Sequence, residues 1–177
     1  MNRRFFLWIG MGLLLNGRVQ AAPKWTTFTS REGRMTLLLP GKPVLNQVSK
    51  QIPMGTVVMR QYIAVSPGYE TICYGMYGDV PGGADQGGIS ADGLLDMMIG
   101  ALVQHNQGTL RGTREITFQG HPGRAFTIDK PNGFVVQYRN YMVGERYYAL
   151  GVCTSAAQVN TPAVKRFLGS LKLLPKK

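Results

Sequence analysis

The sequence predicts an α+β domain in which a mainly antiparallel sheet is covered on both faces. Alternating apolar and polar residues recur between turns rich in glycine and proline, the pattern of strands joined by hairpins. The strands expected at 134–143 and 146–153 carry apolar residues on both faces, so neither face is expected to meet water. Two further segments, 90–107 and 161–171, have helical periodicity and supply the covers.

The N-terminus has the order of a signal peptide. Arg3 and Arg4 precede the apolar run 5–15, and small residues then lead to Ala21. The run is short for a membrane span, and a retained N-terminal anchor is the alternative. The stretch "NRRFFL" also resembles a twin-arginine export signal, with a general secretory signal as the other interpretation. We expect cleavage after Ala21, or after Ala22, and a periplasmic or secreted protein.

Residues 22–177 are long enough for a single domain with a core. Removal of residues 1–21 takes away three of the 20 basic residues, which leaves 17 against nine acidic ones, a net charge of +8. These charges are scattered, so weak attraction to anionic polymers or lipid headgroups is expected. An exported protein rarely meets nucleic acid, which is therefore not an expected partner. No stable membrane span is expected after cleavage.

The first half of the domain predicts two hairpins and a helix. Strands are expected at 25–30 and 34–39, joined by a turn at 31–33, and at 55–65 and 69–79. The segment Pro81–Gly88 lacks the lysine of a phosphate-binding loop and contains an acid, so a flexible loop is favoured. Ser90 then begins the helix, and Gly108 is expected to stop it.

The second half predicts a meander of strands at 113–118, 124–129, 134–143 and 146–153. The two-residue turn Gly144–Glu145 places Val143 opposite Arg146, Tyr141 opposite Tyr148 and Val136 opposite Cys153. Thr161 and Pro162 begin the last helix, and a short strand, 172–174, is expected to follow it.

The stretch "FQGHPGRAF" is interpreted as a hairpin corner. Pro122 and Gly123 suit the two central positions of a type II turn, and His121 before proline is expected to be extended. The binding alternative leaves His121 and Arg124 exposed at the tip, where they would contact an anion.

Cys73 and Cys153 both lie in apolar strands. An oxidising compartment would permit a disulfide between them, and two inert buried thiols are the alternative.

Catalytic and metal-binding patterns are sparse. The two histidines, His105 and His121, have no short ligand spacing to each other or to a cysteine pair, and no Gly-x-Ser-x-Gly motif occurs. Asp92 and Asp96 have a ready interpretation as exposed helix residues. We therefore expect no catalytic residues, no cofactor-binding residues, no metal ligands and no cofactor, and we expect that the protein is not an enzyme.

Four stretches resemble a known group. "REGRMTLLLPGKP", "ITFQGHPGRAF", "RNYMVGERYYALGV" and "VKRFLGSLKLL" occur here in the order found in exported bacterial proteins with the PsbP-like fold. The resemblance spans about residues 25–174 and implies a three-layer α/β/α sandwich around a mainly antiparallel sheet. Members act as accessory or binding subunits or are uncharacterised. An extrinsic subunit of photosystem II shares this fold, but none of its functional residues can be placed on this sequence.

These observations favour an exported, non-catalytic binding or accessory protein of the bacterial envelope. Its expected partner is an envelope protein or an anionic envelope component, met through basic sheet edges and the Pro81–Gly88 loop. Arg124, Arg139 and Arg146 are the candidate contacts, with plain surface as the other interpretation of each. Two other functions remain open: a small-ligand binder or hydrolytic enzyme with a pocket between sheet and helix, and a structural subunit of an envelope complex.

Overall fold

The computed structural model describes residues 24–52, 55–66, 71–82 and 89–175 of the chain. The predicted signal peptide and most of the Pro81–Gly88 loop lie outside the described residues. These described residues form ten strands and two helices, in the order β1 (Thr26–Ser30), β2 (Met35–Leu39), β3 (Val44–Ile52), β4 (Gly55–Val65), β5 (Thr71–Asp79), α2 (Ala91–Asn106), β6 (Thr109–Phe118), β7 (His121–Asp129), β8 (Phe134–Val143), β9 (Arg146–Ser155), α3 (Pro162–Leu168) and β10 (Lys172–Leu173).

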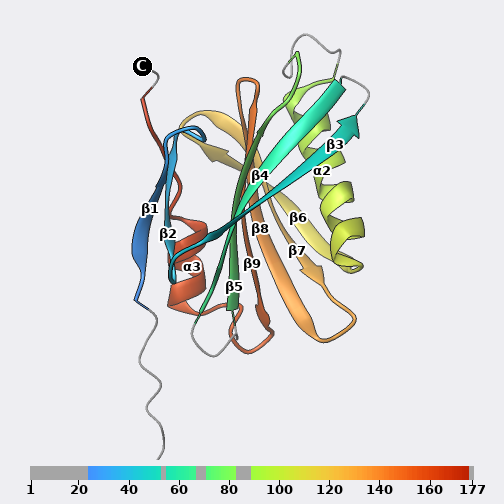
Figure 1. Ribbon diagram of the computed structural model, residues 1–177. Helices are drawn as coiled ribbons and strands as arrows, with labels where there is room; N and C mark the ends of the chain where they lie inside the picture. Colours follow the sequence, from blue (N-terminus) through green and yellow to red (C-terminus); the bar gives the residue numbers. More distant parts are fainter. Residues whose placement is uncertain (1–23, 53–54, 67–70, 83–88, 176–177) are drawn as a thin grey trace, which may run out of the picture.

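Seven strands form one antiparallel sheet in the order β3-β4-β5-β9-β8-β7-β6, and β1-β2-β10 form a second, smaller sheet (Figure 1). Helix α2 packs on one face of the large sheet, against β7 and β8. Helix α3 packs on β9 and β2, so α3 and the small sheet cover the other face. The mainly antiparallel sheet is confirmed. A three-layer α/β/α sandwich is not confirmed, because the second cover is largely a sheet with one short helix.

The two faces of the large sheet bury separate hydrophobic clusters. Alternate residues of β8 divide between them: Tyr138 and Met142 lie beneath α2, whereas Tyr141 lies on the α3 face. The predicted pairing of β8 with β9 is confirmed at Val143–Arg146, Tyr141–Tyr148 and Val136–Cys153. Burial of both faces explains why this hairpin lacks the simple apolar–polar alternation of a half-exposed sheet.

Both helix starts are as predicted. The Ser90 hydroxyl accepts a hydrogen bond from the Gly93 N–H, 3.1 Å, at the first turn of α2. The Thr161 hydroxyl accepts one from the Val164 N–H at the start of α3, and Pro162 occupies the first turn. The end of α2 differs by one residue, because Gln107 and not Gly108 adopts the left-handed conformation that ends the helix.

The predicted turn at Pro122–Gly123 is wrong. The chain reverses at Gln119 and Gly120, which have φ angles of 51° and 81°, and Phe118 pairs with His121. Two positive φ angles define the type I′ class of hairpin turn, whose twist matches that of the strands. Pro122 and Gly123 are therefore strand residues of β7. Pro122 is tolerated there because the pairing of β7 with β8 begins only at Gly123.

Candidate functional site

The four predicted contact residues do not form one site. Arg124 is the clearest correction, because its side chain is only 9 % exposed. Its guanidinium lies 2.7 Å from an Asp92 carboxylate oxygen and donates through Nε to Asp96, 3.3 Å away. Both aspartates belong to the first turns of α2, so Arg124 ties that helix to β7 and is not available to a ligand.

Arg146 also has a structural role. It binds the Asp79 carboxylate through two hydrogen bonds of 2.5 and 2.6 Å and donates a third to the backbone oxygen of Glu32, 2.7 Å away. The guanidinium lies over the ring of Tyr77, 5.1 Å from its centroid. The hydrogen bonds from Arg146 lower the pKa of Asp79. Arg146 therefore joins β9, β5 and the turn after β1, a role that the sequence did not predict.

His121 does not share a cavity lining with Arg124, Arg139 or Arg146. It lines a cavity of about 320 Å³ together with Arg34, Val143, Tyr148 and Leu173. Neither cysteine lies in that cavity, and its described lining has no carboxylate. The described cavity therefore does not gather a histidine, an acid and a thiol.

Cys73 and Cys153 are both free, so the disulfide is corrected. Cys73 pairs with Val152 and lies in the cluster beneath α3, whereas Cys153 pairs with Ile72 and lies in the cluster beneath α2. The two thiols are thus on opposite faces of the sheet, an orientation that a disulfide cannot bridge without backbone movement. Burial raises the pKa of Cys73 to about 12 and also raises that of Cys153, which makes both thiols poor nucleophiles near neutral pH.

The space between the sheet and α2 is small and apolar. A cavity of about 30 Å³ lies there, lined by aliphatic side chains, four methionines and Tyr147. Within the described part of the chain, no group of three histidine, cysteine, aspartate or glutamate residues is arranged to hold a metal ion.

A basic groove lies on the other face of the sheet, beside α3. We define the basic groove as the hollow of about 450 Å³ over β6, β7 and β8 whose cationic side chains are Arg111, Arg114, Arg139 and Lys165. Its described lining includes no carboxylate, and of the four cations Arg111 is bound to Asp129. The groove is therefore a region of uncompensated positive charge.

The strand register explains the shape of the groove. Arg114 of β6 pairs with Ala125 of β7, which pairs in turn with Arg139 of β8, so the two arginines stand on either side of one methyl group. Their backbones are two strand spacings apart, about 10 Å. The neighbouring row is Gly112, Thr127 and Gln137. Uncharged residues thus form the floor, and long cationic side chains form the walls.

Helix α3 completes the groove. Lys165 is exposed on α3, and the Arg139 guanidinium donates to the backbone oxygen of Leu168, 3.3 Å away, in the last turn of the helix. This hydrogen bond fixes Arg139 where β8 meets α3 and leaves other N–H groups of its guanidinium for a ligand. Arg139 was predicted as a contact from the sequence. Arg114 and Lys165 were not, because they belong to different elements that only the fold brings together.

The described residues include no helix that is long and apolar enough to cross a membrane.

Comparison with known proteins supports the fold alone. Neither a protein-family model nor a curated protein matches the chain. The solved structure of cyanobacterial PsbP (CyanoP) from Synechocystis sp. PCC 6803 matches with a TM-score of 0.59 at 9 % identity, over 89 % of this chain and 96 % of that one. The chain therefore has a PsbP-like fold. The protein of unknown function PA94 from Pseudomonas aeruginosa, a putative regulator by its description, matches at 13 % identity over 86 % of this chain and 98 % of that one. Its TM-score of 0.41 is too low to support a shared fold.

Proposed function

We propose that this chain is an exported, non-catalytic binding or accessory protein of the bacterial envelope, and that the basic groove binds an anionic envelope component. The observation that carries the proposal is the charge arrangement of the groove. Arg114, Arg139 and Lys165 meet no carboxylate among its described lining residues. By contrast, Arg124 and Arg146 are each paired with carboxylates of other elements of the fold.

The chemistry of the groove suits an anion with several oxygens. Two guanidiniums carried by backbones about 10 Å apart can each donate to a separate phosphate or carboxylate group. Thr127 and Gln137 on the floor add neutral hydrogen-bonding groups between them. The groove is open to solvent, which suits a headgroup or a polymer segment better than a fully enclosed small molecule.

Export is supported by the basic, apolar and small residues in order at 1–21. A protein delivered to the envelope meets anionic lipid headgroups and anionic polymers, and a net charge of +8 after cleavage, 17 minus 9, attracts both.

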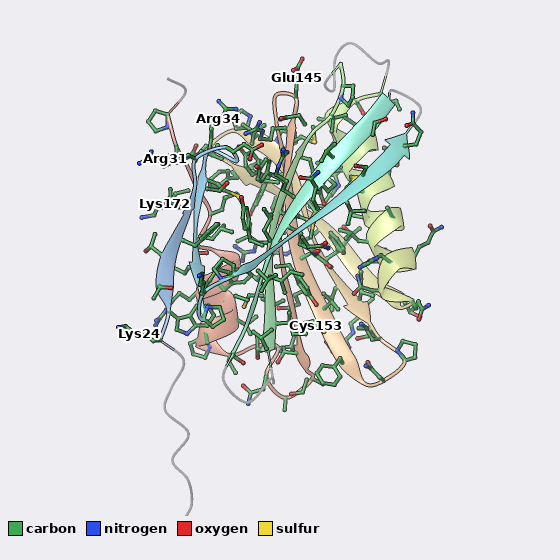
Figure 2. All side chains as sticks on the ribbon, viewed as in Figure 1. Lys24, Arg31, Arg34, Glu145, Cys153 and Lys172 are labelled. Carbon is green, nitrogen blue, oxygen red and sulfur yellow. The ribbon has the colours of Figure 1, made fainter. Side chains whose placement is uncertain are left out.

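The test compares two double variants with the same change in net charge. Arg114→Glu with Lys165→Glu reverses two charges of the basic groove. Lys24→Glu with Lys172→Glu reverses two exposed charges beside and within the small sheet (Figure 2), and neither residue lines the groove. Binding is measured by sedimentation with vesicles of phosphatidylcholine, with and without phosphatidylglycerol, and with polyphosphate in place of vesicles.

We expect the groove variant to bind the anionic probe at least about 30-fold more weakly, because each cation near an anionic surface contributes about 1 kcal/mol. The control should lose much less, and binding of the unaltered protein should weaken as salt is added. Equal losses in the two variants would show that only net charge matters and would refute the groove as the site. Binding to vesicles but not to polyphosphate would identify a lipid headgroup as the ligand.

A further inference from the structure

The edge strand β3 is exposed on both of its faces. Val44, Leu45 and Val48 are 69 %, 54 % and 50 % exposed, and they are three of the six large apolar side chains that are exposed in the described part of the chain. Val44 and Val48 lie on one face of the strand and Leu45 on the other. The strand pairs with β4 on one side only, at the end of the seven-strand order (Figure 1).

The two edges of the large sheet differ in how they are protected. β6, at the opposite edge, has an irregular register between Leu110 and Gly112 and carries exposed Arg111, Arg114 and Glu115. Bulges and charges are the usual devices that keep an edge strand from pairing with another chain. β3 has nine consecutive pairs with β4 and no register shift, and Lys50 is the only charged residue in its sequence. Its outer edge is therefore a regular template for a further strand.

We propose that β3 pairs with β3 of a second copy of this chain, antiparallel about a two-fold axis at Val48. Val48 is the midpoint of the nine-residue strand, so this axis pairs the two strands along their full length. Gln47 then lies opposite Ser49 of the other copy, and Leu45 lies opposite Gln51. Any other axis leaves an overhang. The result is one sheet continuous through both copies, joined by the isologous contact of a two-fold dimer.

The backbone pattern fits this axis. Ser66 donates its N–H to the Thr71 oxygen, so the even-numbered residues of β4 are expected to bond to β5 and the odd-numbered ones to β3. The odd-numbered residues of β4 pair with even-numbered residues of β3. The odd-numbered residues of β3 therefore direct their N–H and C=O groups outward, away from β4. Val48 opposite Val48 is then a non-hydrogen-bonded pair, the kind in which side chains lie closest.

The pairing is independent of anion binding, and salt distinguishes the two. Both copies are basic, so their repulsion opposes dimerisation, and added salt should strengthen self-association. The same salt should weaken binding of an anion in the basic groove. Failure of one proposal therefore leaves the other standing.

The first test is sedimentation equilibrium of the chain without residues 1–21, over a concentration series at low and high salt. We expect a monomer–dimer equilibrium that Val48→Lys weakens about tenfold or more, because it sets like charges directly opposite each other at the axis. Leu110→Lys, the same kind of change on the exposed β6 edge, should leave the equilibrium unaltered. A chain that stays monomeric at every concentration, or equal effects of the two variants, would overturn the proposal.

The second test fixes the register. Val48→Cys should form a disulfide-linked dimer on mild oxidation, since the native thiols are buried and free. Asn46→Cys should not, because the two copies of residue 46 would be about 13 Å apart along the strands. Cross-linking at Asn46→Cys but not at Val48→Cys would overturn the register.

Discussion

Replacement of Gly151 by alanine should destabilise the protein through a single contact. Gly151 of β9 pairs with Tyr138 of β8, and a methyl group at Gly151 would lie 2.8 Å from Cδ1 and 3.0 Å from Cζ of the tyrosine ring. The ring cannot move away easily. It is buried beneath α2, stacks on Phe126 at 5.1 Å between centroids, and its hydroxyl lies 3.4 Å from the Asn106 amide nitrogen.

Overpacking of this kind costs about 1–3 kcal/mol. For a domain of this size the loss corresponds to a decrease in Tm of about 3–10 °C. Urea denaturation followed by tyrosine fluorescence or circular dichroism measures the free energy of unfolding. Gly112→Ala on the edge strand β6 is the matched control, because nothing lies within 4 Å of the added methyl group.

A double-mutant cycle tests the cause. In a Tyr138→Leu background the ring is gone, so Gly151→Ala should cost much less than it does in the native background. An equal cost in both backgrounds would refute the ring contact as the reason. A Gly151→Ala protein as stable as the native one would refute the packing of β8 against β9 beneath α2.

Three further predictions concern the rest of the fold. Thr161→Ala removes the hydroxyl that caps α3 and should lower the free energy of unfolding by about 1 kcal/mol in urea titrations, whereas Thr161→Ser should recover most of it. The lowered pKa of Asp79 stabilises the folded state at pH values above the unfolded pKa of about 4. This contribution should be lost as the pH falls through the lower pKa that Asp79 has in the folded state. Asp79→Asn should remove that part of the pH dependence of the free energy of unfolding. Cys73 and Cys153 should be unreactive toward a thiol reagent at pH 8 in the folded protein, and both should react after denaturation without reductant. Fewer than two reactive thiols in the denatured protein would contradict two free cysteines.

The parts of the fold that could be predicted are those fixed by local chemistry. The turn at Gly144–Glu145 set the register of β8 with β9, and Ser90 and Thr161 marked the helix starts. The turn at 119–120 was missed because Gln119, which is not a typical residue for a positive φ, adopts one, while the Pro122–Gly123 pair suggested a turn of its own. Strand β3 was missed because it buries neither face, so its sequence lacks an inward pattern.

The basic groove could not be predicted in the same way. Arg114 and Arg139 become neighbours only through the register of three strands across Ala125, and Lys165 joins them only because α3 packs on this face. Arg124 shows the reverse case. It sits beside the proline and glycine of an apparent turn, yet the strand register directs it beneath α2 to Asp92 and Asp96.

The most direct test of the central claim is a map of backbone amide chemical shifts during titration of the chain without residues 1–21 with inorganic pyrophosphate. The amides of Gly112, Thr127 and Gln137, on the floor of the basic groove, should shift most and saturate together, and Arg114→Glu with Lys165→Glu should abolish the shifts. Shifts that are largest around Lys24 and Lys172 on the small sheet, or that never saturate at any site, would contradict the account.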